Sequence, residues 1–191
     1  MISDRLIDLV QCPECQSQLT QSEHQFACDR CDRAYPIVDS RFVDLRPEVA
    51  FEEQTKYLDE SLHADGRHER VSPPLLTAGV RHRMLRRLLP FTPFDRVVDL
   101  GCGSGRALYW NRDTRAALTG IDVSPYFSEE ASKDIDLIVG DLRRLPVIDG
   151  RLLRRSLLTW SSTCLVMVSV PCSSKRIAYW TTVANSLSTV M

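Results

Sequence analysis

The sequence predicts an α/β fold in which a small β module with a metal site precedes a parallel sheet. Two observations carry this prediction. Strand and helix patterns alternate over residues 95–149, and two pairs of cysteines lie near the N-terminus. Alternating strands and helices build parallel sheets with helices on their faces. A chain of 191 residues, 43% of them hydrophobic, is long enough for one such domain and a small module.

Changes in composition along the chain, and the positions of its prolines, divide it into four segments. We expect a small β module at 1–46, a helical connector at 47–92, a parallel-sheet unit at 93–150 and a tail without an evolved fold at 151–191. Two helices are expected in the connector, near 49–64 and 76–89, separated by a loop that contains Pro73 and Pro74. The three histidines of the connector, His63, His68 and His82, are expected on the surface.

Four cysteines in the first segment have the spacing of a metal site. Cys12 and Cys15 form one C-x2-C pair, and Cys28 and Cys31 form a second pair after twelve residues. Four thiolates arranged as a tetrahedron suit a structural zinc ion, and the metal would supply much of the folding energy of so small a module. A rubredoxin-like iron site and free thiols are the alternatives. His24, between the two pairs, is expected on the surface.

The cysteine segment also resembles a known family. The stretches "CPECQSQL" and "CDRCDRAYPIVDSRFVDLRP" are similar to the small zinc-ribbon activator subunit of tRNA and protein methyltransferases, over residues 6–47. A related ribbon precedes the catalytic domain of some ribosomal-RNA guanine methyltransferases. The resemblance therefore implies a zinc ribbon that either binds substrate or braces a neighbouring domain.

The stretch "RVVDLGCGSGRAL" predicts a strand at 96–100, a glycine loop and the start of a helix. Glycines let the backbone turn sharply and approach a ligand closely, as in dinucleotide-binding folds. Asp99, just before the loop, suits the amino group of a methionine moiety and would repel a pyrophosphate. The loop therefore favours S-adenosylmethionine over NAD, and Cys102 within it is interpreted as a small loop residue.

Two further acids follow the next predicted strands. Asp122 lies at the end of the strand expected at 118–123, where a carboxylate can accept hydrogen bonds from ribose hydroxyls. Asp141 follows the strand expected at 137–139, where a carboxylate can accept from an adenine amino group. This order predicts a Rossmann-like parallel sheet with its cofactor at the carboxyl ends of the strands.

Together these motifs resemble the class I S-adenosylmethionine-dependent methyltransferases of the type 11 kind, over residues 75–149. The resemblance implies cofactor contacts at Asp99, Gly101, Cys102, Gly103, Gly105, Asp122, Val123, Asp141 and Leu142. It names no catalytic residue in this chain. An NAD-dependent oxidoreductase is the enzyme alternative.

The resemblance stops after "DLRRLPVIDG", so the sheet is expected to be incomplete after its third strand. Residues 151–191 hold five of the 24 basic residues, none of the 25 acidic residues and no glycine. Codons for Thr159–Trp180 can be chosen so that the same bases, translated from one base earlier, encode "DVVEHLPRDGERALLEQAHRVL". This alternative translation resembles the part of the methyltransferase family that should follow residue 150. We therefore expect a C-terminus that is truncated and frameshifted; the alternative is a genuine, divergent tail with strands through 165–170.

These observations predict a zinc-ribbon methyltransferase whose methyl acceptor is unidentified. The ribbon is expected to fold with metal, whereas the methyltransferase half is expected to be unstable or inactive in this chain. The alternative is a non-catalytic zinc-ribbon binding or activator module. A net charge of −1 gives no support for a nucleic-acid partner. The N-terminus lacks the pattern of a signal peptide and the tail's apolar run is too short for a bilayer, so a cytoplasmic protein without a membrane partner is expected.

Overall fold

The computed structural model describes residues 2–46, 96–113, 116–148, 154–160 and 163–168. Its helices and strands within these ranges, in chain order, are α1 (Asp4–Ile7), β1 (Thr20–Gln21), β2 (Gln25–Cys28), β3 (Arg33–Val38), β4 (Phe42–Asp44), β5 (Arg96–Leu100), α3 (Arg106–Tyr109), β6 (Ala117–Asp122), α4 (Glu129–Asp134), β7 (Asp136–Val139), the 3-10 helix η3 (Leu142–Arg144), β8 (Arg154–Trp160) and β9 (Thr163–Val168). The helices expected at 49–64 and 76–89 lie outside the described residues, as do His63, His68 and His82.

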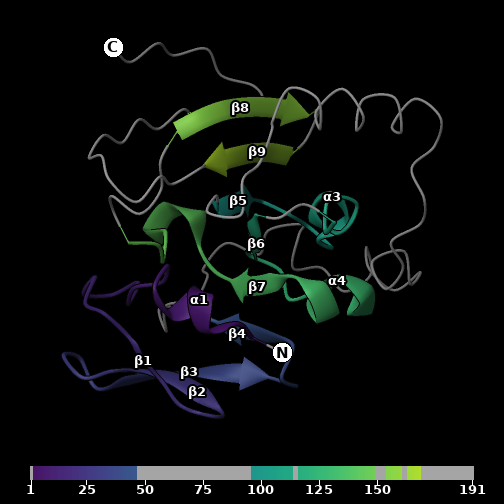
Figure 1. Ribbon diagram of the computed structural model, residues 1–191. Helices are drawn as coiled ribbons and strands as arrows, with labels where there is room; N and C mark the ends of the chain where they lie inside the picture. Colours follow the sequence, from purple (N-terminus) through teal and green to yellow (C-terminus); the bar gives the residue numbers. More distant parts are fainter. Residues whose placement is uncertain (1, 47–95, 114–115, 149–153, 161–162, 169–191) are drawn as a thin grey trace, which may run out of the picture.

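The strands of the N-terminal module and those of the parallel unit form one seven-stranded sheet, in the order β1-β2-β3-β4-β7-β6-β5. Strands β1 to β4 pair antiparallel as hairpins. Strands β5, β6 and β7 pair in parallel, and β4 joins them by a parallel pairing with β7, in which Val43 lies opposite Ile138. Figure 1 shows this arrangement, with β1 to β3 at one end of the molecule and the parallel strands at its centre.

The parallel strands are buried on both faces, as the apolar runs in their sequences predict. Because neighbouring residues of a strand point to opposite faces, Val97 and Val98 of β5 belong to different hydrophobic clusters. Val98 packs with residues of the N-terminal module, which include Leu6 and Phe26. Val97 packs with Leu108 of α3 and with Ala131 of α4. The module therefore covers one face of the sheet in addition to extending its edge.

The turn between β3 and β4 holds two residues in the left-handed backbone region. Asp39 and Ser40 have φ values of 50° and 56°, and the N–H of Arg41 donates to the carbonyl of Val38 at 2.8 Å. Two successive residues with positive φ are typical of hairpin turns, in which the second position favours glycine.

The Ser40→Gly substitution should therefore stabilise the protein by about 0.5–1 kcal/mol, because glycine adopts positive φ without the steric cost that serine incurs. Urea denaturation measures the change. The matched control is Ser22→Gly in the β1–β2 turn, where φ is not positive and the serine hydroxyl donates to the Gln25 carbonyl at 3.0 Å. This control should lower stability, and a lower midpoint for Ser40→Gly as well would contradict the interpretation of the turn.

Strands β8 and β9 pair antiparallel with each other in a separate two-stranded sheet. The backbone of β9 runs beside β5, the end strand of the seven-stranded sheet (Figure 1). Strand structure in this region, which the alternative of a genuine tail places at 165–170, is thus observed at 163–168. In the described ranges, no helix combines the length and the apolar composition required to cross a membrane.

Candidate functional site: a four-cysteine centre and the carboxyl edge of the parallel strands

The four cysteines of the N-terminal module come together as predicted. The sulfur atoms of Cys12, Cys15, Cys28 and Cys31 all lie within 4.8 Å of one another. Three of the separations are 3.5 Å for Cys12–Cys31, 3.4 Å for Cys15–Cys28 and 3.8 Å for Cys15–Cys31. Sulfurs bound at about 2.3 Å to a central tetrahedral zinc lie roughly 3.8 Å apart. The donor set and its spacing therefore fit zinc.

The two cysteine pairs are built alike. Each pair is followed by a residue in the left-handed backbone region, Gln16 with φ 59° and Asp32 with φ 55°. In the first pair the N–H of Gln16 also donates to the carbonyl of Cys12 at 2.8 Å. In both pairs the left-handed residue directly follows the second cysteine, and the two sulfurs of each pair lie within 4.8 Å of each other.

The thiols of the cluster differ in their readiness to ionise. Hydrogen bonds from the side chain and backbone of Ser17 lower the pKa of Cys15 to about 6. Burial, together with hydrogen bonds shared with the other thiols, raises the pKa of Cys31 to about 12. A metal ion would bind all four groups as thiolates, so metal binding should release protons and weaken as pH falls.

Tyr35 is a partner of this centre that the cysteine spacing did not reveal. Its buried hydroxyl lies 3.2 Å from the sulfur of Cys12, and burial and the neighbouring thiols raise the pKa of the phenol above its usual range. A neutral phenol beside a thiolate donates a hydrogen bond to it. Such outer partners orient metal ligands and tune metal affinity.

The Tyr35→Phe substitution should therefore weaken zinc binding by about tenfold, since outer-shell partners contribute 10- to 100-fold. Competition with a chromogenic chelator measures the affinity. The Co²⁺-loaded protein should also shift its thiolate-to-metal absorption band, a change that loss of packing alone would not produce. Unchanged affinity and an unchanged band would show that the hydroxyl makes no hydrogen bond to the ligand.

The glycine loop directly follows β5, at the carboxyl edge of the sheet. Gly101, Gly103 and Gly105 have φ values of 80°, 56° and 79°. A Cβ added at Gly105 would lie 2.9 Å from the Cβ of Ala131, so this position needs glycine for space as well as for conformation. A Cβ added at Gly103 would meet no atom within 4 Å. The loop thus exposes its backbone at Gly103 to open space, as close approach to a ligand requires.

Asp99 is a buried acid with a free acceptor. Its side chain is 1% exposed, and its Oδ1 has no hydrogen-bond partner among the described residues. Burial, and secondarily the charge of Asp122, raise the pKa of Asp99 to about 7. A buried carboxylate with one oxygen unpartnered, beside a glycine loop, fits a cationic ligand group, which would supply both a hydrogen bond and a compensating charge.

Asp122 and Asp141 lie at the carboxyl ends of β6 and β7, the same edge of the sheet, and each already has local partners. The carboxylate of Asp122 accepts from the Gly103 N–H at 2.8 Å and from the N–H and hydroxyl of Ser124, both at 3.0 Å. The carboxylate of Asp141 caps η3 by accepting from the Arg143 N–H at 2.8 Å. In both acids Oδ1 accepts two hydrogen bonds, whereas Oδ2 accepts one and retains a second lone-pair direction. These acids therefore hold the loops in place as well as lining the edge.

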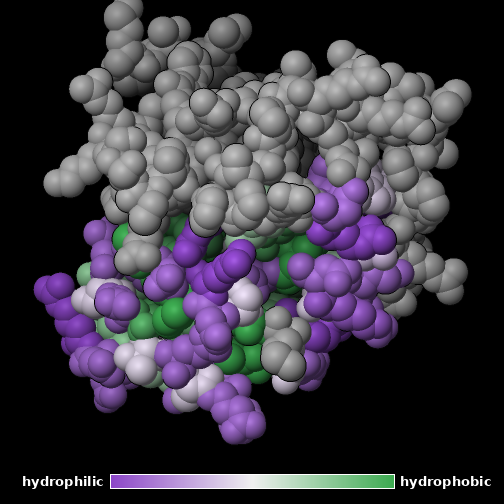
Figure 2. Space-filling model, viewed as in Figure 1, coloured by the Kyte–Doolittle hydropathy of each residue, from purple (hydrophilic) through white to green (hydrophobic). Residues whose placement is uncertain are grey.

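The remaining predicted cofactor residues occupy the same edge. Val123 follows Asp122 and is half-buried, and Cys102 is buried with a pKa raised by burial, as expected of an inert loop residue. Hydrophilic residues cover most of the described part of the face in Figure 2. Leu142 is the exposed large hydrophobic side chain of the described ranges, at 45%. Its exposure next to Asp141 suits a residue that packs against a flat apolar ligand group.

Comparison with known families separates the two parts of the chain. Residues 3–40 match the family model described as Trm112p-like protein, and residues 98–152 match the model described as a methyltransferase domain. The chain joins a Trm112p-like zinc ribbon to a methyltransferase domain. The resemblances expected from the cysteine spacing and from the glycine loop are thus both confirmed, as is a Rossmann-like fold preceded by a ribbon.

Comparison with solved structures gives a match to part of the chain. The X-ray structure of YjhP from E. coli is 27% identical over 41% of this chain and 34% of that one, with a TM-score of 0.29. The chain thus spans about a third of the length of that protein. A search of curated protein sequences found no match.

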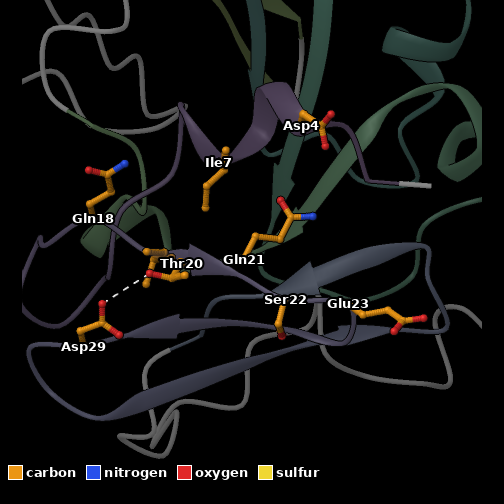
Figure 3. Close-up of a pocket in the computed structure, with 9 residues that line it drawn as sticks. Asp4, Ile7, Gln18, Thr20, Gln21, Ser22, Glu23 and Asp29 are labelled. Atoms are coloured by element: carbon orange, nitrogen blue, oxygen red, sulfur yellow. Dashed lines mark hydrogen bonds between the residues drawn. The ribbon is translucent and has the colours of Figure 1, made fainter.

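A groove on the ribbon lies apart from these residues. It has a volume of about 880 Å³ and is lined by Asp4, Ile7, Gln18, Leu19, Thr20, Gln21, Ser22, Glu23 and Asp29 (Figure 3). None of the residues that line it is among the predicted metal or cofactor residues. The groove therefore does not overlap the four-cysteine centre or the carboxyl edge of the sheet.

Proposed function

We propose that the chain binds S-adenosylmethionine at the carboxyl edge of β5, β6 and β7 and belongs to an enzyme that transfers its methyl group. The buried Oδ1 of Asp99, which has no hydrogen-bond partner, is the observation that carries this proposal. S-adenosylmethionine has a positive ammonium group and a positive sulfonium group, and a pyrophosphate-containing dinucleotide offers neither. The match to a methyltransferase domain over 98–152 supports the same choice.

Each residue of the edge would have a distinct part in holding this cofactor, which supplies an activated methyl group when bound. Asp99 would pair with its positive charge, and the backbone at Gly101 and Gly103 would allow close approach. Asp122 would accept from the ribose hydroxyls and Asp141 from the adenine amino group, with Leu142 against the base. Methyl transfer then depends chiefly on how the acceptor is positioned.

We propose that the four cysteines hold a structural zinc ion. Four thiolate ligands leave no open position on a tetrahedral ion, so this centre would stabilise the ribbon and take no part in the transfer. For this chain we expect cofactor binding without turnover, because residues 151–191 depart in composition from a methyltransferase.

The Asp99→Asn substitution tests the proposal. Removal of the charge should weaken S-adenosylmethionine binding by about 10- to 100-fold, the usual worth of a charge-assisted hydrogen bond. Isothermal titration calorimetry on the zinc-loaded chain measures this. Asp134→Asn, which removes a half-exposed acid of α4, is the matched control and should bind as the unaltered chain does. Equal affinity of the two variants would contradict the role given to Asp99.

Binding should also depend on pH through Asp99. The cofactor cation prefers the ionised carboxylate, whose pKa is raised to about 7 in the free protein. Affinity should therefore rise by up to tenfold per pH unit below 7 and level off above it, with proton release on binding near neutrality.

The contribution of Asp99 to folding stability has the opposite pH dependence. Between pH 4 and 7 the native state binds more protons at Asp99, so its contribution to stability falls as pH rises. Asp99→Asn should abolish both dependences.

The second candidate is a non-catalytic ribbon module, and the match of residues 3–40 to the Trm112p-like family favours it. Such a module needs zinc but no cofactor. A zinc-loaded chain that folds cooperatively and fails to bind S-adenosylmethionine would support this candidate over the first.

A further inference from the structure

The first cysteine pair of the ribbon contacts the segment that follows β7, which carries Asp141 and Leu142. The carboxylate of Glu14, between Cys12 and Cys15, pairs with Arg144 of η3 at 3.2 Å. The side chain of Glu14 is 23% exposed and that of Arg144 is 49% exposed, so solvent weakens the pair without removing it. This ion pair therefore connects the end of η3 to the loop that carries Cys12 and Cys15.

Backbone hydrogen bonds tie the same two segments just beyond this ion pair. The N–H of Gln11 donates to the carbonyl of Pro146 at 3.0 Å, and the N–H of Ile148 donates to the carbonyl of Leu9 at 2.9 Å. Between them, Val10 forms an antiparallel bridge with Val147, and both side chains are buried. The next residue after Gln11 is the metal ligand Cys12. The stretch 9–15 therefore touches the 144–148 segment along its length while its cysteines belong to the metal centre.

We propose that the first cysteine pair, through Glu14 and residues 9–11, positions the 141–148 segment and so couples metal binding in the ribbon to cofactor binding at the sheet edge. Glu14 is a positioning residue in this proposal, since it acts through Arg144. The proposal rests on the proposed function for its second half, the effect on S-adenosylmethionine. Its first half, the restraint of the segment by the ribbon, needs no cofactor.

Hydrogen exchange on the zinc-loaded chain tests the first half. Glu14→Gln removes the charge and keeps the shape, and it should speed exchange at the Arg143 and Arg144 amides about two- to fivefold, the range expected for a partly exposed ion pair. The Leu45 amide, which donates to Val139 in the ribbon-to-sheet contact, should be unaffected. Arg144→Gln should have the same effect, and the double variant no more than either single one. Glu23→Gln, at an exposed ribbon acid, is the control.

The second half is tested by linkage, because coupling between two sites is reciprocal. Saturating S-adenosylmethionine should tighten zinc binding by up to about fivefold in chelator competition, and Glu14→Gln should remove much of this gain. Unchanged exchange at Arg143 and Arg144 in Glu14→Gln would overturn the proposed restraint. Cofactor binding without any change in zinc affinity would overturn the coupling. If the cofactor does not bind at all, the proposed function fails, and the exchange result still decides whether the ribbon restrains the segment.

Discussion

The Cys28→Ser substitution should abolish zinc binding and unfold the chain well beyond the ribbon. Cys28 is buried and its sulfur lies 3.4 Å from that of Cys15. Structural zinc sites contribute about 10–16 kcal/mol of apparent binding free energy, which is as large as the whole stability of a typical domain. Because Leu6 and Phe26 of the ribbon share a core with Val98 of β5, loss of the ribbon exposes one face of the parallel sheet as well.

Circular dichroism melting and metal analysis by mass spectrometry measure this effect together. The variant should contain less than one zinc per chain, and its thermal transition should fall by about 10 °C or more or become non-cooperative. Cys102→Ser is the control, since that cysteine lies in the glycine loop outside the metal cluster, and its zinc content should be unchanged. A metal-free Cys28→Ser chain that melts like the unaltered one would show that the ribbon does not support the sheet.

Translation of the codons for residues 151–191 in the alternative frame should have the second large effect, on both stability and cofactor affinity. Residues 1–150 contain all 25 acidic residues of the chain and all eight glycines, and residues 151–191 contain neither type. We propose that this segment is translated out of frame, and that the other frame encodes the strand and helix that normally follow the third strand of a methyltransferase. Those elements would take the place beside β5, where the backbone of β9 runs.

A gene with one base inserted before the codon for Leu158, which moves translation into the frame that begins one base earlier, provides the test, expressed beside the unaltered gene. The restored chain should melt at a higher temperature than the unaltered chain and bind S-adenosylmethionine at least tenfold more tightly, because a completed crevice contacts more of the ligand. Resequencing of independent template DNA across the codons for 145–160 shows which frame is native. A restored chain that aggregates or binds no more tightly would favour a genuine, divergent tail.

The strands of the parallel unit were predictable because buried parallel strands have apolar sequences with no competing pattern. The strand expected at 96–100 is β5, and those expected at 118–123 and 137–139 are β6 at Ala117–Asp122 and β7 at Asp136–Val139. The metal cluster was likewise predictable, because two C-x2-C pairs are a typical ligand set of a structural zinc site.

The union of the two parts was not predictable from local pattern. The pairing of Val43 with Ile138 joins residues 95 positions apart, and the short strand Phe42–Asp44 contains nothing that specifies its partner. The contacts of Glu14 and Tyr35 were not predicted for a similar reason, because the hydrogen-bond or ion-pair partner of a polar residue cannot be inferred until the fold is known. The segment boundaries at 46, 92 and 150 stay predictions.

An NMR titration of the zinc-loaded, ¹⁵N-labelled chain with S-adenosylmethionine tests the central claim most directly, because it reports both binding and its location. The account predicts amide shifts at 101–105, 122–124 and 141–142, with smaller shifts at Leu9 and Gln11 in the ribbon. In Asp99→Asn the same shifts should require a cofactor concentration about 10- to 100-fold higher. No shifts at saturating cofactor, or shifts confined to the ribbon groove at 18–23, would contradict a cofactor site at the carboxyl edge of the sheet.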